Sequence, residues 1–299
     1  MRTIAFMQDG REKLGVVTNR GVLDVELAAE RFDQLKMNPS QPQTVMNLIK
    51  GGSAARNALE ALTELAIAEQ DESVFLQEEE IQYLPSVTNP EKILCVGLNY
   101  KNHADGSKME LPEKPIIFSK FKNALCAHQE EISLSDNANQ FDYEAELAIV
   151  IGKTGKYIEQ EDALSYVYGY TIGNDFSARD LQFASSQWLL GKNGDKFCPL
   201  GPELVTADEI ENPQNLKIKT YINNEIRQDG CTKDMIFPCD EIISYISKHM
   251  TLQPGDVILT GTPEGVVMEK EKHEQQWLKS GDNIKIEIER LGKIENNLK

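Results

Sequence analysis

The run Tyr143-Glu144-Ala145-Glu146-Leu147-Ala148-Ile149-Val150-Ile151 (residues 143–151) decides how this chain is interpreted. Residues 147–151 are all apolar, which predicts a buried β-strand. Alternate side chains of a strand point to the same face, so Glu144 and Glu146 share one face. Two ionised carboxylates there repel each other and lose hydration, which costs several kcal/mol each unless a positive charge compensates. A divalent cation would compensate, so the pattern predicts a metal site.

A third ligand is expected at Asp175, which lies in Gly173-Asn174-Asp175-Phe176-Ser177 after the expected strand 168–172. Three carboxylates with water in the remaining positions suit Mg²⁺ or Mn²⁺, and oxygen ligands also accept Ca²⁺. In an alternative interpretation, Asp175 or Ser177 caps the following helix. Asp142 lies two residues before Glu144, so on an extended strand its side chain would point to the same face as the two glutamates. It is a fourth ligand, a group behind the ligands, or a residue at an exposed strand end.

Three further residues are candidates for chemistry. His103 follows the expected strand 93–96 and precedes Asp105 by two residues, and a histidine there could serve as a general base. Lys192 lies in a glycine-flanked loop and could pair with a substrate carboxylate. Thr262 lies in the turn 260–263 and could offer its hydroxyl to a ligand. The alternatives are an exposed or structural histidine, a solvated surface lysine and a plain turn.

The composition excludes several classes of partner. With 31 Lys+Arg and 48 Asp+Glu, the 299-residue chain has a formal net charge of −17, which disfavours nucleic acid and anionic membranes. No apolar run approaches the ~20 residues that span a bilayer. The five cysteines form no CxxC pair, which predicts free thiols in a cytoplasmic protein. Dinucleotide, phosphate-loop and serine-hydrolase motifs do not occur.

Two parts of the chain differ in the secondary structure that their sequence patterns predict. Residues 1–85 predict a small N-terminal α/β domain, with strands at 3–6, 14–17 and 22–25 and helices at 26–35, 44–49 and 54–68. Residues 86–299 predict mainly strands, at 93–96, 116–118, 144–151, 168–172, 216–222, 257–260 and 284–288, with helices at 161–166, 178–186 and 239–248. Strands outnumber helices without regular alternation, which favours a β-rich α+β fold.

Several motifs together resemble the fumarylacetoacetate hydrolase family. They are FDYEAELAIVIGK, GYTIGNDFSARDLQ, the Lys192 loop and MTLQPGDVILTGTPEGV, with GLNYKNH upstream. The resemblance covers about residue 92 to the C-terminus, and residues 1–85 resemble more weakly the leading domain of longer bacterial members. It implies a β-sandwich-like roll, usually assembled as a homodimer.

The resemblance also implies roles for individual residues. It places Mg²⁺ or Mn²⁺ on Glu144, Glu146 and Asp175, with Lys192 beside the ion and His103 over it. Gln182 and Thr262 contact the substrate, and Arg179, in the same motif as Gln182, is a third substrate-binding candidate. Members of the family act on 2-oxo acids and acylpyruvates by hydrolysis of a C–C bond, decarboxylation or isomerisation.

The reaction expected first is metal-dependent hydrolysis of a C–C bond in an acylpyruvate. The 2-oxo carboxylate would chelate the metal ion, which would stabilise the enolate, while His103 activates water. One departure matters, because Gly106 stands where many small members have a glutamate three residues after the histidine. Asp105 or Glu110 would have to replace it. Two alternatives therefore stay open: an oxaloacetate decarboxylase or 2-hydroxydienoate isomerase on the same site, and a non-catalytic protein that binds metal and keto acid.

Overall fold

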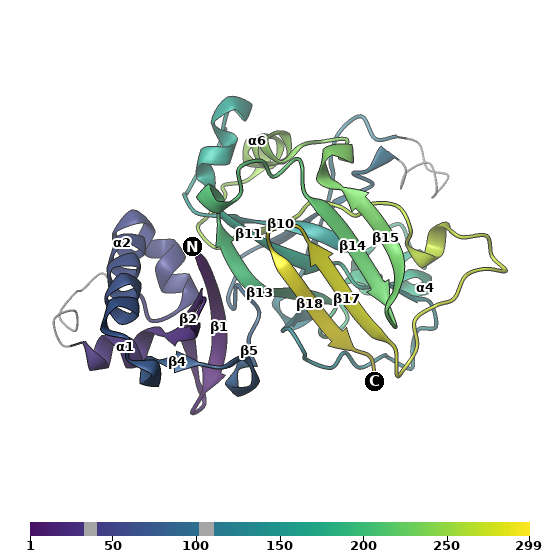
Figure 1. Ribbon diagram of the computed structural model, residues 1–299. Coiled ribbons are helices and arrows are strands. Elements are labelled where there is room, and N and C mark those ends of the chain that lie inside the picture. The colour runs from purple at the N-terminus through teal and green to yellow at the C-terminus, as the bar shows by residue number, and fades with distance from the viewer. Residues whose placement is uncertain (33–40, 102–110) are drawn as a thin grey trace.

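The structure is a computed structural model that describes residues 1–32, 41–101 and 111–299. A large mixed sheet and a smaller antiparallel sheet form its main body (Figure 1). The large sheet contains β1 (Arg2–Gln8), β2 (Arg11–Thr18), β3 (Gly21–Asp24), β4 (Phe75–Leu76), β5 (Gln82–Tyr83), β6 (Ile93–Gly97), β7 (Ile116–Lys120), β8 (Leu125–Cys126), β10 (Ala145–Ile151), β11 (Val167–Asn174), β13 (Cys198–Thr206) and β16 (Val257–Leu259).

The smaller sheet contains β15 (Glu225–Cys231), β14 (Lys217–Ile222), β17 (Asn283–Ile288) and β18 (Gly292–Asn297), in that spatial order. A short pair joins β9 (Phe141–Asp142) to β12 (Ser177–Ala178). The α-helices of the described residues are α1 (Val25–Arg31), α2 (Val45–Glu69), α4 (Arg179–Gln182), α5 (Leu189–Lys192) and α6 (Cys239–His249).

β10 lies in the interior of the large sheet, between β11 and β16. All seven of its residues are buried, which confirms the strand predicted from the apolar run. Glu146 pairs with Gly173 of β11, and the N–H of Asp175 donates to the carbonyl of Glu144 at 3.0 Å. The pairing therefore brings Asp175 beside the two glutamates, although about thirty residues separate them along the chain.

The smaller sheet packs on the large one through a mainly apolar inner face, in which Thr220, Gln228 and Asn296 are buried polar exceptions. Buried and partly exposed residues alternate along β17, and its inward residues, Ile284, Ile286 and Ile288, belong to the same core as Leu147 and Ile149 of β10. A period of two with one buried face is what two packed sheets require. The β-rich α+β fold and the sandwich-like roll predicted from the sequence are confirmed.

The N-terminal unit shares the large sheet with the rest of the chain. β1 pairs antiparallel with β2 and also with β13, where Thr3 lies opposite Leu204. Figure 1 shows β1 running beside β13 at the junction. Backbone hydrogen bonds thus cross the predicted domain boundary at residue 85, which itself stays a prediction.

Some helices differ from expectation. The two expected at 44–49 and 54–68 form one element, α2, which is interrupted at Gly52 by a φ of 57°. The helix expected at 178–186 is only the single turn α4, and 161–166 lies in a 3₁₀ helix, Gln160–Tyr166. α5 packs directly onto α4: a Cβ placed on Gly191 would lie 2.4 Å from the backbone nitrogen of Gln182.

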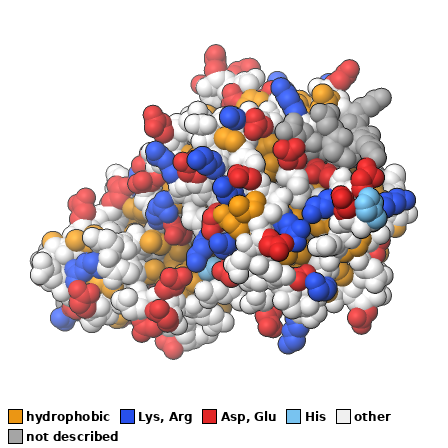
Figure 2. Space-filling view, turned by 45° about the vertical axis from the view of Figure 1, so that its right-hand side comes forward, with side chains coloured by type: hydrophobic (Ala, Val, Ile, Leu, Met, Phe, Trp, Pro, Cys, Tyr) orange, Lys and Arg blue, Asp and Glu red, His pale blue; other side chains and the backbone are white. Residues whose placement is uncertain are grey.

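Acidic and basic side chains are interspersed over the face shown in Figure 2, with small apolar patches between them. Across residues 1–32, 41–101 and 111–299, no helix combines the length and the apolar character that crossing a bilayer requires.

His128 is a buried titratable group at the junction between the N-terminal unit and the smaller sheet. The N–H of Glu295 in β18 donates to its Nδ1 at 3.0 Å, and the ring of Tyr83 in β5 meets it edge-on at 5.0 Å between centroids. Because Nδ1 accepts a backbone hydrogen bond, the proton of the neutral ring is on Nε2. Burial lowers the pKa of His128 from 6.5 to about 4.

Acidification should therefore destabilise the fold through His128. The folded state binds the proton more weakly than the unfolded chain, so this contribution is complete above pH 6.5 and is lost as the pH falls towards 4. Between pH 7 and pH 5 we expect the wild type to lose about 1–2 kcal/mol more unfolding free energy than His128→Gln. Urea denaturation at the two pH values measures the difference, and equal losses in the two proteins would contradict it.

Candidate active site

Glu144, Glu146 and Asp175 form a compact acid cluster. Each offers one carboxylate oxygen, and these oxygens lie within 4.8 Å of one another. All three side chains are buried, with exposed fractions of 6%, 2% and 0%. A set of convergent carboxylate oxygens is what a hard divalent cation prefers, so these residues fit such an ion.

The helix-cap interpretation of Asp175 and Ser177 is wrong. Ala178 occupies the N-cap position of α4 and no side chain caps that helix. The Ser177 hydroxyl instead donates to the carbonyl oxygen of Asp175 at 2.8 Å. The Asp175 carboxylate is thereby available to the acid cluster.

Three buried cations surround the cluster. Lys192 Nζ lies 2.8 Å from Glu144 Oε2 and 2.7 Å from Asp175 Oδ2, and so bridges two of the acids. Arg179 Nη1 lies 2.6 Å from Glu144 Oε1. Lys120 Nζ pairs with Asp175 Oδ1 and also donates to the carbonyl of Phe176 at 3.2 Å. The Lys120 side chain is fully buried, and nothing in the sequence analysis singled it out.

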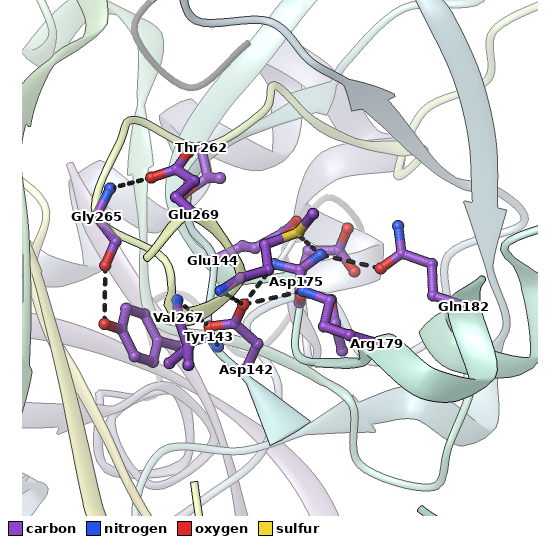
Figure 3. A network of polar contacts seen from close by, with 12 residues as sticks. Asp142, Tyr143, Glu144, Asp175, Arg179, Gln182, Thr262, Gly265, Val267 and Glu269 are labelled. Atoms are coloured by element: carbon purple, nitrogen blue, oxygen red, sulfur yellow. Dashed lines mark hydrogen bonds and ion pairs between the residues drawn. The ribbon is translucent and has the colours of Figure 1, made fainter. Parts of the chain in front are cut away.

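Asp142 lies behind the acid cluster, which agrees with one of the three interpretations left open. It is fully buried, which rules out an exposed strand end. Its Oδ2 accepts from Arg179 Nε at 2.9 Å and from the N–H of Met268 at 3.1 Å, and its Oδ1 accepts from the N–H of Val267 at 2.8 Å. Figure 3 shows Asp142 facing Arg179 beside Glu144. With both oxygens engaged, Asp142 orients Arg179.

The surroundings of Glu146 favour a positively charged group beside its carboxylate. Its carboxylate accepts a hydrogen bond from the N–H of Gly261 at 2.6 Å. Burial and the charges of Asp175 and Glu144 raise the pKa of Glu146 well above its ordinary value. For Lys192, burial lowers the pKa, but Asp175 and Glu144 outweigh burial and leave it raised. Lys192 is therefore stabilised as a cation, and a further positive charge beside Glu146 would offset the burial of its carboxylate.

The acid cluster opens into a pocket with an aromatic wall of Phe118 and Trp188. Predicted site residues that line it are Glu144, Glu146, Arg179, Gln182, Lys192 and Thr262. Arg179 Nη1 donates to Gln182 Oε1 at 2.9 Å. Because a guanidinium has no acceptor, this contact orients the amide, and Gln182 Nε2 remains to donate to a ligand.

The structure brings together most, but not all, of the predicted site. The three acids, Lys192, Arg179, Gln182 and Thr262 meet at one place. His103 and Asp105 lie outside the described residues, as do Gly106 and Glu110. The catalytic roles given to His103, Asp105 and Lys192 and the substrate contacts of Gln182, Thr262 and Arg179 stay predictions.

Comparisons with known proteins show which family and which folds the chain is similar to. The fumarylacetoacetate (FAA) hydrolase C-terminal family matches residues 92–299. The chain is 39% identical over 303 residues to "Oxaloacetate tautomerase Fahd2a, mitochondrial" of Rattus norvegicus, which covers 100% of this chain and 91% of that protein. The fold of this chain is similar to that of a fumarylacetoacetate hydrolase from Exiguobacterium antarcticum. The TM-score is 0.79 and the sequence identity 32%, and the match covers 100% of this chain and 99% of that chain.

A second similar structure carries ligands. It is a maleylpyruvate hydrolase from Sphingobium sp. SYK-6 in complex with manganese(II) and pyruvate, with a TM-score of 0.77 and 27% identity over 100% of this chain and 98% of that chain. The rat protein is named as mitochondrial, and the cytoplasmic location expected here stays a prediction.

Loss of the Lys120 charge should destabilise the protein strongly. Lys120→Met leaves one oxygen of the buried Asp175 without its cation, and removing one partner of a buried pair costs about 3–5 kcal/mol. The matched control is Lys122→Met, because Lys122 is exposed and should change stability by less than about 0.5 kcal/mol. Chemical denaturation of both variants measures the difference, and similar stabilities would refute the role given to Lys120.

Proposed function

The chain belongs to the fumarylacetoacetate hydrolase family and is an enzyme, and we propose that it catalyses keto–enol tautomerisation of a small 2-oxo acid of the oxaloacetate type. The observation that carries the proposal is the buried acid cluster at the base of a pocket with cations and hydrogen-bond donors. Identity of 39% along the whole chain to a protein named oxaloacetate tautomerase supports this reaction over the others.

Charge balance at the site supports an anionic substrate. The buried ionic groups are four carboxylates and three cations, namely Asp142, Glu144, Glu146 and Asp175 with Lys120, Arg179 and Lys192. Their formal charges sum to −1, which a divalent cation would change to +1. A site of net positive charge in a buried setting attracts carboxylates even in a chain of net charge −17.

We assign the divalent cation, Mg²⁺ or Mn²⁺, to Glu144, Glu146 and Asp175. Such an ion, when bound, supplies a Lewis acid against the negative charge that develops on a substrate oxygen. The side chains around it have separate tasks. Lys192 holds a fixed positive charge beside Glu144 and Asp175. Arg179 keeps Glu144 in place from the opposite side, and Gln182 offers an amide hydrogen to the substrate.

Tautomerisation needs a proton to move between carbon and oxygen, and no attacking water. We assign the proton transfer to His103, for which the sequence predicts the role of a general base that activates water. The absence of the family glutamate, replaced by Gly106, weakens the activation of water more than it weakens a reaction that only forms an enolate. This departure favours tautomerisation over C–C bond hydrolysis, the reaction expected first from the sequence.

Hydrolysis of a C–C bond in an acylpyruvate is the second candidate. The similarity to a maleylpyruvate hydrolase bound to manganese(II) and pyruvate favours it, because pyruvate is a small 2-oxo acid of the class proposed here. Decarboxylation of oxaloacetate and isomerisation of a 2-hydroxydienoate use the same pocket and stay open. We further propose a homodimer, as the resemblance implies.

Turnover of oxaloacetate should depend on a divalent cation. Ultraviolet absorbance measures the rate at which its enol and keto forms interconvert. With Mg²⁺ or Mn²⁺ present, the rate with the protein should exceed the rate with the free ion alone, and EDTA should abolish the difference. Acetylpyruvate and fumarylpyruvate in the same assay test hydrolysis. Activity on an acylpyruvate with none on oxaloacetate would transfer the assignment to the second candidate, and inactivity on all three would overturn both.

Glu146→Gln should abolish the response to metal. The amide keeps the shape and can still accept from the N–H of Gly261, but it removes one negative charge from the acid cluster. We expect kcat to fall by roughly 100-fold or more, because several kcal/mol of charge stabilisation are lost. Thermal stabilisation by Mn²⁺ should disappear as well, whereas the exposed Glu161→Gln should keep both properties. A fully active Glu146→Gln protein would refute the metal site.

A further inference from the structure

One wall of the pocket changes from charged to aromatic over the width of a single ring. Trp188 immediately precedes α5 and Lys192 ends it, so the two side chains start one helical turn apart. Both reach the same ring of β7. Lys192 Nζ lies 5.2 Å from the centroid of Phe118, and the Trp188 ring meets Phe118 edge-on at 5.3 Å between centroids. The wall therefore runs from the ammonium group beside the acid cluster, across Phe118, to the indole.

Gly97, the last residue of β6, makes room for this indole. A Cβ placed on Gly97 would lie 2.6 Å and 2.9 Å from two carbons of the Trp188 ring, which is closer than side chains pack. The next nearest atom, Cβ of Ile116, would lie at an ordinary 3.7 Å, and the φ of Gly97 is outside the left-handed region. The close approach of the indole is thus what excludes a side chain at this strand end.

We propose that Gly97 and Trp188 together limit the size of the chain that a substrate carries beyond its 2-oxo acid head. Both residues line the pocket together with Glu144 and Glu146. The inference rests on the proposed function, in which the acid cluster and its metal ion hold the head. The rest of the substrate must then occupy the remainder of the pocket, along the wall that ends at the indole.

The contacts of the indole make this limit a firm one. Phe118 blocks the ring on one side and the backbone of Gly97 blocks it on another, so a bulky chain cannot displace it without breaking that packing. The substrate class that fits is a 2-oxo acid with a short chain, such as oxaloacetate, and not an arylpyruvate.

A ratio of two dissociation constants tests the limit. Pyruvate and phenylpyruvate share the same head, but one carries a methyl group and the other a benzyl group. Each is titrated in competition with oxalate on the Mn²⁺-loaded protein by calorimetry. The wild type should favour pyruvate, and Trp188→Ala should shift the ratio at least about 10-fold towards phenylpyruvate, because the benzyl group enters the space that the indole leaves. Changes in Mn²⁺ affinity or in binding of the head cancel in the ratio.

Leu190→Ala is the matched control. Leu190 is an exposed apolar residue of the same helix and is not among the described residues that line the pocket. The ratio in Leu190→Ala should stay within about twofold of the wild-type ratio. If Trp188→Ala does not fold, Trp188→Leu replaces it throughout and should shift the ratio at least about threefold.

A double-mutant cycle tests the seat of the indole on Gly97. Gly97→Ala should lower the melting temperature of the wild type by at least about 3 °C, because the new methyl group overlaps the ring. In the Trp188→Ala background the same change should lower it by less than about 1 °C. Equal shifts in the two backgrounds, or no shift in the wild type, would overturn the pairing of Gly97 with Trp188.

The size limit itself would be overturned by an unchanged ratio in Trp188→Ala, by a shift towards pyruvate, or by a wild type that favours phenylpyruvate. The ratio reads binding alone. A shifted ratio in a protein that does not turn over oxaloacetate would reject the tautomerase proposal and keep this one, whereas an active enzyme with an unchanged ratio would do the reverse. If neither probe displaces oxalate, the site does not hold a 2-oxo acid head and both proposals fall.

Discussion

Compensation of buried negative charge is the constraint on which this structure depends. Four carboxylates lie close together in the interior, and each would be unstable there without a positive partner or several N–H donors. The partners come from separate elements: Lys120 ends β7, Arg179 begins α4 and Lys192 ends α5. These elements converge on the end of β10, where α4 and α5 pack against each other as two short helices.

The acids of the site could be predicted from the sequence because strand geometry is periodic. The apolar run 147–151 identified a buried strand, and parity alone placed Glu144 and Glu146 together. Lys120 could not be predicted, because nothing local distinguishes it from the exposed Lys122 two residues later.

The fold was predictable to a similar extent. Strands with apolar or alternating patterns, such as β10, β11 and β17, were identified within a few residues. β13 was missed because Pro199, Gly201 and Pro202 are unfavourable in a regular strand, and here its pairing with β11 shifts register between Tyr170 and Ile172. β18 was missed because Gly292–Asn297 is largely polar; only Ile294 and Asn296 are buried in it.

The pairing of β1 with β13 has a consequence for shorter proteins built on the same roll. On the side away from β11, β13 is covered by β1 along Glu203, Leu204 and Val205, and by β8 further along. Without the leading segment, those backbone groups would form an open edge, which invites pairing with another molecule. A relative without this segment would have to protect that edge with a different strand, a charged residue or a neighbouring subunit.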